Sequence, residues 1–274
     1  MRKTILSAAS LAALVTSSLP ATVFAEDGDE EGYLTEPVVF AQRRLVMAAG
    51  QIRPDASIYF AQFGADSDTF IGINALVDWA PIEKLQVGAL AVPLLLSPDA
   101  EYGDPMLYAR YLLLDGNFQL AVEGGYTFSN LGDDEEGGSP GAIHLGVPLR
   151  YALNPAARLD FRPVLVLNLP PSGGDLVADL NLGLSLGVSL TRNIYIDVTT
   201  GLAIPDFDFD LASIPLGLEV GYSLEGNENA AFIDIYLSAG FDAFLLPNAP
   251  EGADALNLDV WTIALGGRFH FALE

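Results

Sequence analysis

The sequence contains no cysteine and few basic residues. Without cysteine, no disulfide can stabilise any part of its 274 residues. Lysine and arginine total 12 against 36 aspartates and glutamates, and the formal net charge of −24 excludes the basic patch that binds nucleic acid. With two histidines and no cysteine, the chain shows no cluster with metal-ligand spacing. We therefore expect no metal site, no cofactor and no nucleic-acid partner.

Long hydrophobic runs are absent beyond the first 25 residues. Residues 1–25 begin with two basic residues, continue with an apolar run over 5–15 and end on Ala25, which predicts a secretory signal peptide cleaved after Ala25. Downstream, the longest apolar candidate, residues 91–96, contains Pro93 and is far shorter than the ~20 residues of a transmembrane helix. Yet 51% of the chain is hydrophobic. Such an exported chain is either a soluble β-sandwich or a closed barrel whose apolar face contacts lipid.

Instead of long hydrophobic runs, the chain shows strict alternation of apolar and polar residues. In residues 176–190, LVADLNLGLSLGVSL, an aliphatic side chain stands at every second position from Ala178 to Leu190. This period predicts a long strand with one apolar and one polar face. The pattern recurs and predicts 12 strands, near residues 51–63, 69–80, 84–95, 105–115, 118–129, 141–152, 158–169, 177–190, 194–204, 212–224, 230–245 and 256–271.

The connections between these strands alternate in length. Tight turns fall at 81–83, 116–117, 154–156, 191–193 and 226–229, whereas the other connections, apart from the short first one at 64–68, are longer. Short turns at one end and longer loops at the other are typical of outer-membrane barrels. Over residues 51–271 the chain therefore resembles the bacterial outer-membrane β-barrel family. The resemblance implies an all-β fold, a transmembrane antiparallel up-and-down β-barrel of about 12 strands.

The resemblance also implies a location and partners. The last predicted strand, WTIALGGRFHF, carries Phe269 and Phe271 on one face and resembles the strand that the barrel-assembly machinery reads in this family. We expect export to the outer membrane of a Gram-negative-type bacterium, with membrane lipid and lipopolysaccharide as further partners. Residues 26–50 are predicted to be an acidic periplasmic extension that precedes the barrel.

The longer loops are acidic, with no lysine or arginine in them. The clearest members of this acidic rim are Asp133, Asp134, Glu135, Glu136, Asp206, Asp208 and Asp210. The rim would concentrate cations, or bind divalent cations shared with lipopolysaccharide. The alternative is a solvated rim whose charge keeps neighbouring barrels apart. Several of the few basic residues, Lys84, Arg158 and Arg192, are instead assigned to the tight turns.

The polar phase of each strand predicts a lumen that mixes acids and arginines. The charged and histidine residues assigned to it are Arg53, Asp55, Asp78, Arg110, Glu123, His144, Arg150, Asp160, Arg162, Asp179, Asp197, Glu219, Asp234, Asp242, Arg268 and His270. The turn lengths set Arg110 opposite Glu123 and Arg150 opposite Asp160. Inward glycines such as Gly72, Gly88 and Gly221 are expected to leave room inside.

Twelve strands lie between side-chain-filled small barrels and open porins, so several functions remain. We predict a narrow passive pore for small hydrophilic solutes or cations. The alternative is a closed structural or surface-interaction barrel without transport. An outer-membrane hydrolase is the weakest hypothesis, because His144 and His270 fall on different strands and no nucleophile motif surrounds a serine. We therefore assign no catalytic residue.

Overall fold

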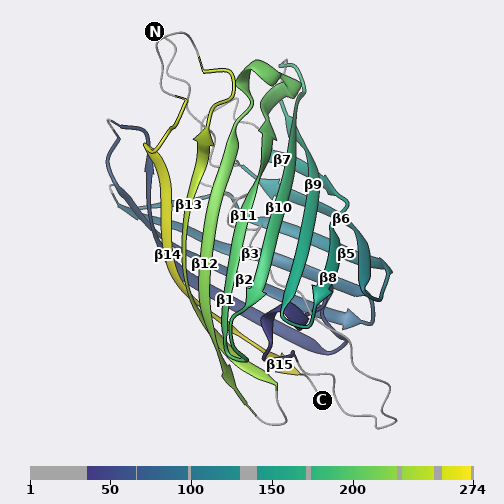
Figure 1. The fold of residues 1–274 in the computed structure, drawn as a ribbon. Helices are drawn as coiled ribbons and strands as arrows, with labels where there is room; N and C mark the ends of the chain where they lie inside the picture. The colour runs from purple at the N-terminus through teal and green to yellow at the C-terminus, as the bar shows by residue number, and fades with distance from the viewer. Residues whose placement is uncertain are drawn as a thin grey trace.

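The computed structural model describes residues 36–65, 67–97, 100–129, 141–170, 174–226, 230–249 and 255–272. These residues form an antiparallel sheet that closes on itself as a barrel (Figure 1). The strands are β1 (Gln51–Phe63), β2 (Phe70–Ile82), β3 (Leu85–Ser97), β4 (Glu101–Tyr102), β5 (Met106–Leu114), β6 (Phe118–Phe128), β7 (Gly141–Gly146), β8 (Leu149–Asn154), β9 (Ala157–Leu169), β10 (Val177–Ser189), β11 (Ile194–Ile204), β12 (Ile214–Glu225), β13 (Ala231–Leu245), β14 (Val260–Phe269) and β15 (Phe271–Ala272). The predicted signal peptide lies outside the described residues.

The wall of the barrel has 12 strands, as the sequence predicts. Strands β7 and β8 are two parts of one strand, because both pair with β6 on one side and β9 on the other. Strands β14 and β15 likewise both pair with β1, and β4 is a short addition to β3. Antiparallel pairing of β14 with β1 closes the sheet, so no long strand is left as an open edge.

In the described ranges, three short 3-10 helices accompany the strands. They are η2 (Phe40–Gln42), η3 (Pro205–Phe207) and η4 (Phe209–Leu211). In the part of the chain that the structure describes, no helix has the length and apolar character needed to cross a membrane. Helices η3 and η4 lie at the long-loop end, and η2 precedes β1.

The alternation in β10 places its leucines outside and its small polar residues inside. Leu184 and Leu186 are 39% and 41% exposed, whereas Ser185 and Ser189 are buried. The same separation holds around the wall, where exposed apolar side chains include Ile58, Phe60, Val77, Leu107, Val122, Leu145, Val198, Leu218, Val220, Leu237, Ile263 and Leu265. A continuous apolar outer band around a polar interior is the arrangement that a bilayer stabilises.

Replacing Leu184 by arginine is expected to lower the free energy of unfolding by about 2–4 kcal/mol, since position 184 is in the middle of β10 and faces outward. The matched control is Asn181→Arg on the same strand, which places the same charge on the inner face near Asp179 and should cost much less. Urea titration of both variants in lipid vesicles measures the difference. Equal losses would mean that the two faces of β10 are assigned wrongly.

At four inward glycines, a tyrosine ring occupies the space that a side chain would take. Tyrosine rings lie over glycines on the neighbouring strand in the pairs Tyr59–Gly72, Tyr108–Gly88, Tyr195–Gly221 and Tyr236–Gly266. A Cβ atom at Gly72, for example, would lie 2.3 Å from the ring of Tyr59. The expectation that glycines widen the lumen is therefore wrong at these positions, because each missing side chain makes space for a tyrosine.

Candidate functional site

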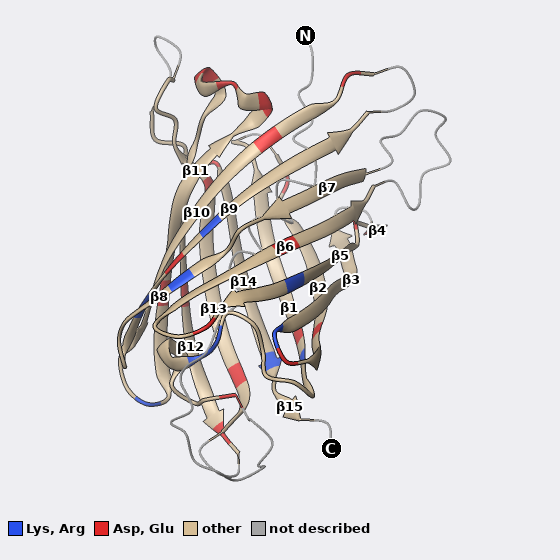
Figure 2. Cartoon of the chain, turned by 90° about the vertical axis from the view of Figure 1, so that its right-hand side faces the viewer, with Lys and Arg blue, Asp and Glu red and all other residues tan. Residues whose placement is uncertain are grey.

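The charges of the barrel are distributed unequally between its two ends. Each inward arginine of the wall lies at the middle of its strand or nearer to the short-turn end. In the described long-loop half, the charged residues at inward strand positions are Asp179 of β10 and Asp242 of β13. Figure 2 shows the same division, with blue segments in the middle and lower part of the barrel and red at the upper loops.

The acidic rim is described only in part. Asp206, Asp208 and Asp210 are exposed at η3 and η4, at the long-loop end. The backbone N–H of Asp206 donates to Asp179 Oδ1 at 2.9 Å, and Asn168 Nδ2 donates to Asp179 Oδ2 at 2.7 Å. Hydrogen bonds of Asp179 therefore connect the acidic rim to the inner face of the wall. Residues Asp133, Asp134, Glu135 and Glu136 lie outside the described residues.

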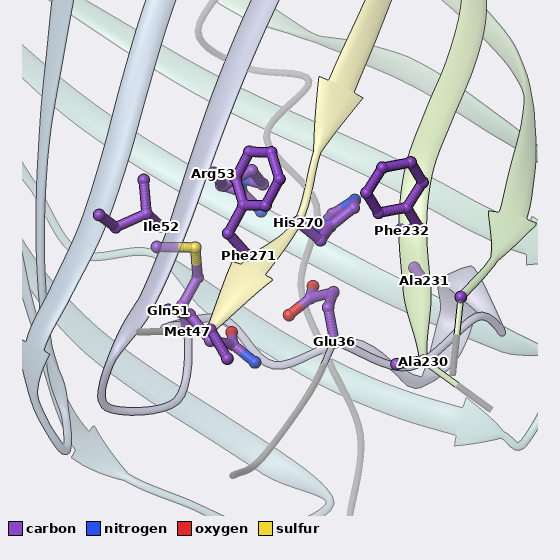
Figure 3. A pocket seen from close by; sticks show the side chains of 12 residues that line it. Glu36, Met47, Gln51, Ile52, Arg53, Ala230, Ala231, Phe232, His270 and Phe271 are labelled. Atoms are coloured by element: carbon purple, nitrogen blue, oxygen red, sulfur yellow. The ribbon is translucent and has the colours of Figure 1, made fainter. Parts of the chain in front are cut away.

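Residues 36–50, which we name the internal segment, cross the barrel at its short-turn end. Their side chains are largely buried, and at its beginning and end the segment bonds to the wall: Ala231 N donates to Glu36 O at 2.7 Å, and Gly50 N donates to Ala80 O at 2.8 Å. Figure 3 shows Glu36 and Met47 of this segment beside β1 and β15. The described part of the predicted acidic extension therefore packs inside the barrel end.

Polar side chains of the wall bond to the backbone of the internal segment. Guanidinium groups donate to three of its carbonyl oxygens: Arg158 to Phe40, Arg150 to Arg43 at 3.2 Å, and Arg110 to Leu45 at 3.0 Å. Side-chain carbonyls accept from its N–H groups, with Gln119 bonded to Leu45 N at 2.7 Å and Gln86 to Met47 N at 3.3 Å. Residues from β3, β5, β6, β8 and β9 thus hold one segment.

Side chains of the internal segment also pack into the lumen. The Phe40 ring stacks on Tyr195 with ring centroids 3.9 Å apart, and the Arg158 guanidinium lies 3.7 Å from the Phe40 centroid. Arg158 is fully buried on β9. The assignment of Arg158 to the charge of a tight turn is therefore wrong, because as the second residue of β9 it shares the inward phase of Asp160.

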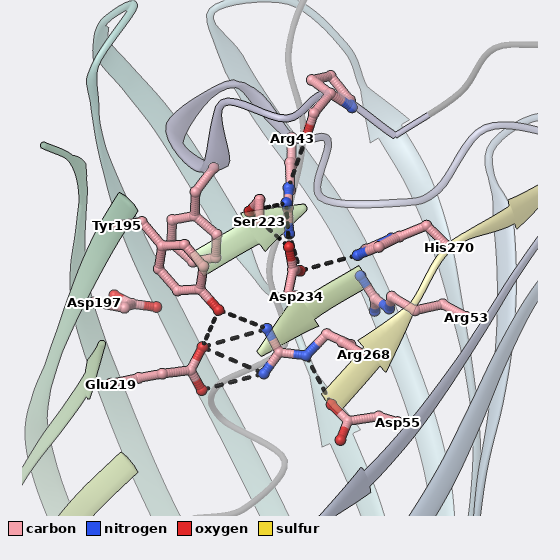
Figure 4. Close-up of polar contacts among 12 residues, drawn as sticks. Arg43, Arg53, Asp55, Tyr195, Asp197, Glu219, Ser223, Asp234, Arg268 and His270 are labelled. Carbon is pink, nitrogen blue, oxygen red and sulfur yellow. Dashed lines mark hydrogen bonds and ion pairs between the residues drawn. The ribbon is translucent and has the colours of Figure 1, made fainter. Parts of the chain in front are cut away.

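Arg43 anchors the internal segment to β12 and β13. Its guanidinium pairs with Asp234, with Nη2 donating to Oδ1 at 2.7 Å, and also donates to Ser223 Oγ at 2.9 Å (Figure 4). Burial acts to lower the pKa of Arg43, but the Asp234 carboxylate outweighs it and raises the pKa above its usual value. The guanidinium therefore keeps its charge, and the pair keeps its strength, throughout the physiological range.

Arg268 connects three strands across the lumen (Figure 4). It donates to Asp55 Oδ2 of β1 at 2.7 Å and to Glu219 Oε2 of β12 at 3.1 Å. The hydroxyls of Tyr195 and Tyr236 donate to Glu219 and Asp55, at 2.9 and 2.7 Å. Each carboxylate is therefore held by both a guanidinium and a phenol, and Arg268 itself is fully buried.

The two predicted cross-strand pairs are confirmed. Arg110 is opposite Glu123 in the register and Arg150 is opposite Asp160, and both pairs are salt bridges inside the barrel. Arg162 also bonds to Glu123, at 2.5 Å. The remaining predicted lumen residues are buried or half-buried as well: Arg53 and Asp78 form an ion pair, Asp197 lies 4.0 Å from Arg158, and Asp179, Asp242, His144 and His270 are inward.

Neither histidine has a serine as its hydrogen-bond partner among the described residues. His144 Nε2 lies 2.8 Å from Thr127 Oγ1, and His270 Nε2 lies 2.9 Å from Asp234 Oδ2. Asp234 stands between His270 and Ser223, whereas a hydrolase needs the histidine next to the serine. Among the described residues, no group of three or more potential ligands could hold a metal ion.

No protein-family description and no curated protein sequence matches this chain. Two solved structures share its architecture. The NanC porin has 11% sequence identity and a TM-score of 0.57, with 79% of this chain and 98% of that chain covered. The KdgM porin, solved in complex with disordered oligogalacturonate, has 8% identity and a TM-score of 0.53, with 81% and 99% covered. At these identities the likeness concerns the fold, and the chain has the fold of bacterial outer-membrane porin-like barrels.

Proposed function

We propose that this protein is an outer-membrane barrel that forms a narrow passive pore for small hydrophilic solutes, with a preference for cations. The apolar outer band and the likeness to two porin folds support the membrane setting. Export would remove residues 1–25, and the barrel-assembly machinery would insert the barrel into the outer membrane. Lipid and lipopolysaccharide would then surround it, with divalent cations at the acidic rim.

The observation that carries the cation preference is the division of charge along the lumen. The charges of the long-loop half are carboxylates, and Asp242 Oδ1 is buried without a hydrogen-bond partner among the described residues. Toward the short-turn end, arginines such as Arg53, Arg110 and Arg268 are neutralised by ion pairs. A solute that enters from the loops therefore meets a negative potential first, which concentrates cations and repels anions.

The internal segment sets the narrowest part of the proposed pore. Phe40 and Arg43 project among the inward side chains, and the tyrosine rings over glycines fill further space. These groups leave less space for a large solute than a lumen without them would. Ions and small hydrophilic molecules are therefore the solutes that this lumen suits.

A second candidate function is a closed structural barrel without transport. The observation in its favour is the number of wall residues that bond to the internal segment, since these bonds come from β5, β6, β8 and β9 and, through Arg43, from β12 and β13. The two candidates differ in whether the folded protein conducts.

Planar-bilayer recording across a KCl gradient tests the pore. We expect discrete conductance steps and a reversal potential of the sign that indicates cation preference. The double variant Asp179→Asn with Asp242→Asn should reduce that preference, because it removes the two inward carboxylates of the long-loop half while keeping side-chain size.

The matched control for this double variant is Glu83→Gln, which removes one charge at an exposed tight turn and should leave the reversal potential unchanged. Anion preference in the wild-type protein would contradict the proposed selectivity. Silence of a barrel whose folding is verified would favour the closed structural candidate.

A further inference from the structure

A cavity lies at the short-turn end, between the start of the internal segment and the barrel wall (Figure 3). Its volume is about 170 Å³. One water needs roughly 10–15 Å³ on this measure, so the cavity has room for an organic molecule of several heavy atoms. Its walls come from the internal segment, β1, β13 and β15, with His270 between β14 and β15, and they include Glu36, Met47, Ile52, Phe232 and Phe271.

Glu36 is the polar group of this cavity that lacks a partner. The residue is 4% exposed, and neither of its carboxylate oxygens has a hydrogen-bond partner within the described part of the chain. In Figure 3 the carboxylate points into the space bounded by Met47, His270 and Phe271. A buried carboxylate without a partner is costly, and a cationic ligand would remove that cost.

The basic groups near Glu36 are already paired with other acids. Arg53 bonds to Asp78 through Nε at 3.2 Å and Nη2 at 2.5 Å. His270 bonds to Asp234, which also holds Arg43. Arg43 and His270 are near enough to interact electrostatically with Glu36, but both bond to Asp234 instead, so the Glu36 carboxylate has no bonded counter-ion among the described residues. The cavity therefore attracts a positively charged ligand.

The remaining walls distinguish an organic cation from a metal ion. Met47, Ile52, Phe232 and Phe271 supply apolar surface, and the rings of Phe232 and Phe271 lie edge to face with centroids 6.3 Å apart. Gln51 and His270 also line the cavity, but Glu36 is its one carboxylate, and among the described residues no group of three or more His, Cys, Asp or Glu could hold a metal ion. An ammonium group on a short carbon chain fits both features, because aromatic faces attract ammonium and the chain contacts the apolar walls.

We propose that this cavity binds a primary ammonium group carried on a short carbon chain, with Glu36 as its counter-ion. Two sources supply this chemistry: a free alkylamine, and the ethanolamine headgroup of a membrane lipid. Phe232 and Phe271 are also exposed on the outer surface, at 47% and 44%, so the cavity adjoins the membrane as well as the aqueous side. The proposal is independent of whether the barrel conducts.

Calorimetric titration of the full chain in detergent with butylammonium chloride tests the free amine. We expect saturable binding that falls about tenfold or more in Glu36→Gln, because that change removes the counter-ion while keeping side-chain shape. Glu83→Gln, an exposed carboxylate at a tight turn, is the matched control and should bind like the wild-type protein. Ala230→Phe fills the cavity and leaves Glu36 intact, so binding should be lost there too.

The second arm tests the lipid headgroup. The thermal unfolding midpoint is compared in phosphatidylcholine vesicles with and without phosphatidylethanolamine, and the lipid source predicts an increase that Glu36→Gln removes. Binding in either arm supports the proposal and names the source. Neutral 1-butanol binding as tightly as butylammonium, or Glu36→Gln binding unchanged in both arms, would overturn it. Absence of binding in both arms would overturn it equally.

Discussion

Replacing Arg43 by alanine is expected to loosen the internal segment beside β12 and β13 and to raise the single-channel conductance. The substitution removes the ion pair with Asp234 and the bond to Ser223, and both Arg43 and Asp234 are fully buried. Removing one partner of a buried pair typically costs about 3–5 kcal/mol, because the other charge stays buried. The backbone bonds that remain contribute about 0.5–1.5 kcal/mol each and still hold the rest of the segment, so water entering around Asp234 should loosen the part of the segment next to Arg43.

Arg44→Ala is the matched control for this experiment. Arg44 is the next residue of the same segment, but its partner Asp115 is partly exposed at a tight turn, and such a pair contributes about 0–1 kcal/mol. Bilayer recording of both variants should show a larger conductance for Arg43→Ala alone. A folded Arg43→Ala barrel that conducts like the wild-type protein would show that the internal segment is not the narrowest part of the pore.

Much of the wall of this barrel could be predicted from the sequence, because residues close together in the chain determine its strands and their register. A period of two residues decides which side chains face lipid, and a tight turn fixes the register of the strands it joins. The turn at Gly116 therefore sufficed to set Arg110 opposite Glu123, and the structure has that pair. Strands β1 and β11 begin and end at the predicted residues for the same reason.

The internal segment could not be placed from the sequence because nothing in it is periodic. Its apolar residues, such as Phe40 and Val46, follow no strand pattern, and one short 3-10 helix is its regular structure in the described residues. Its place depends on side chains far along the chain: Arg110, Arg150 and Arg158 bond to its carbonyl oxygens. One feature of the sequence did point to such a segment. Most of the few arginines fall on inward strand positions, and a buried guanidinium needs hydrogen-bond partners inside the barrel.

The alternation pattern of the strands also does not predict how side chains fill the lumen. The inward phase of Gly72 and Gly88 is visible in the sequence, but the orientation of the tyrosines is not. Whether Tyr59 points along the lumen or lies over Gly72 depends on its rotamer and on the strand beside it. The sequence therefore could not show that tyrosine rings occupy the space over these glycines.

Replacing Arg268 by leucine is expected to lower the free energy of unfolding of the barrel by about 3–5 kcal/mol. Arg268 is fully buried and holds Asp55 and Glu219, which belong to different strands. Without it, both carboxylates face the lumen with only tyrosine hydroxyls as partners. Urea titration in lipid vesicles, followed by the fluorescence of Trp79 and Trp261, gives the loss.

Arg192→Leu is the matched control, because Arg192 pairs with Glu225 where both side chains are substantially exposed, and such a pair contributes about 0–1 kcal/mol.

Adding Asp55→Asn and Glu219→Gln to Arg268→Leu should restore more than half of the lost stability, since the amides carry no charge and still accept from the tyrosines. That recovery would mean that these charges stabilise the wall rather than select solutes, and selectivity would then belong to Asp179 and Asp242. If Arg268→Leu lowers the free energy of unfolding no more than Arg192→Leu does, water must solvate the unpaired carboxylates of Asp55 and Glu219. The lumen around Arg268 would then be hydrated rather than closely packed.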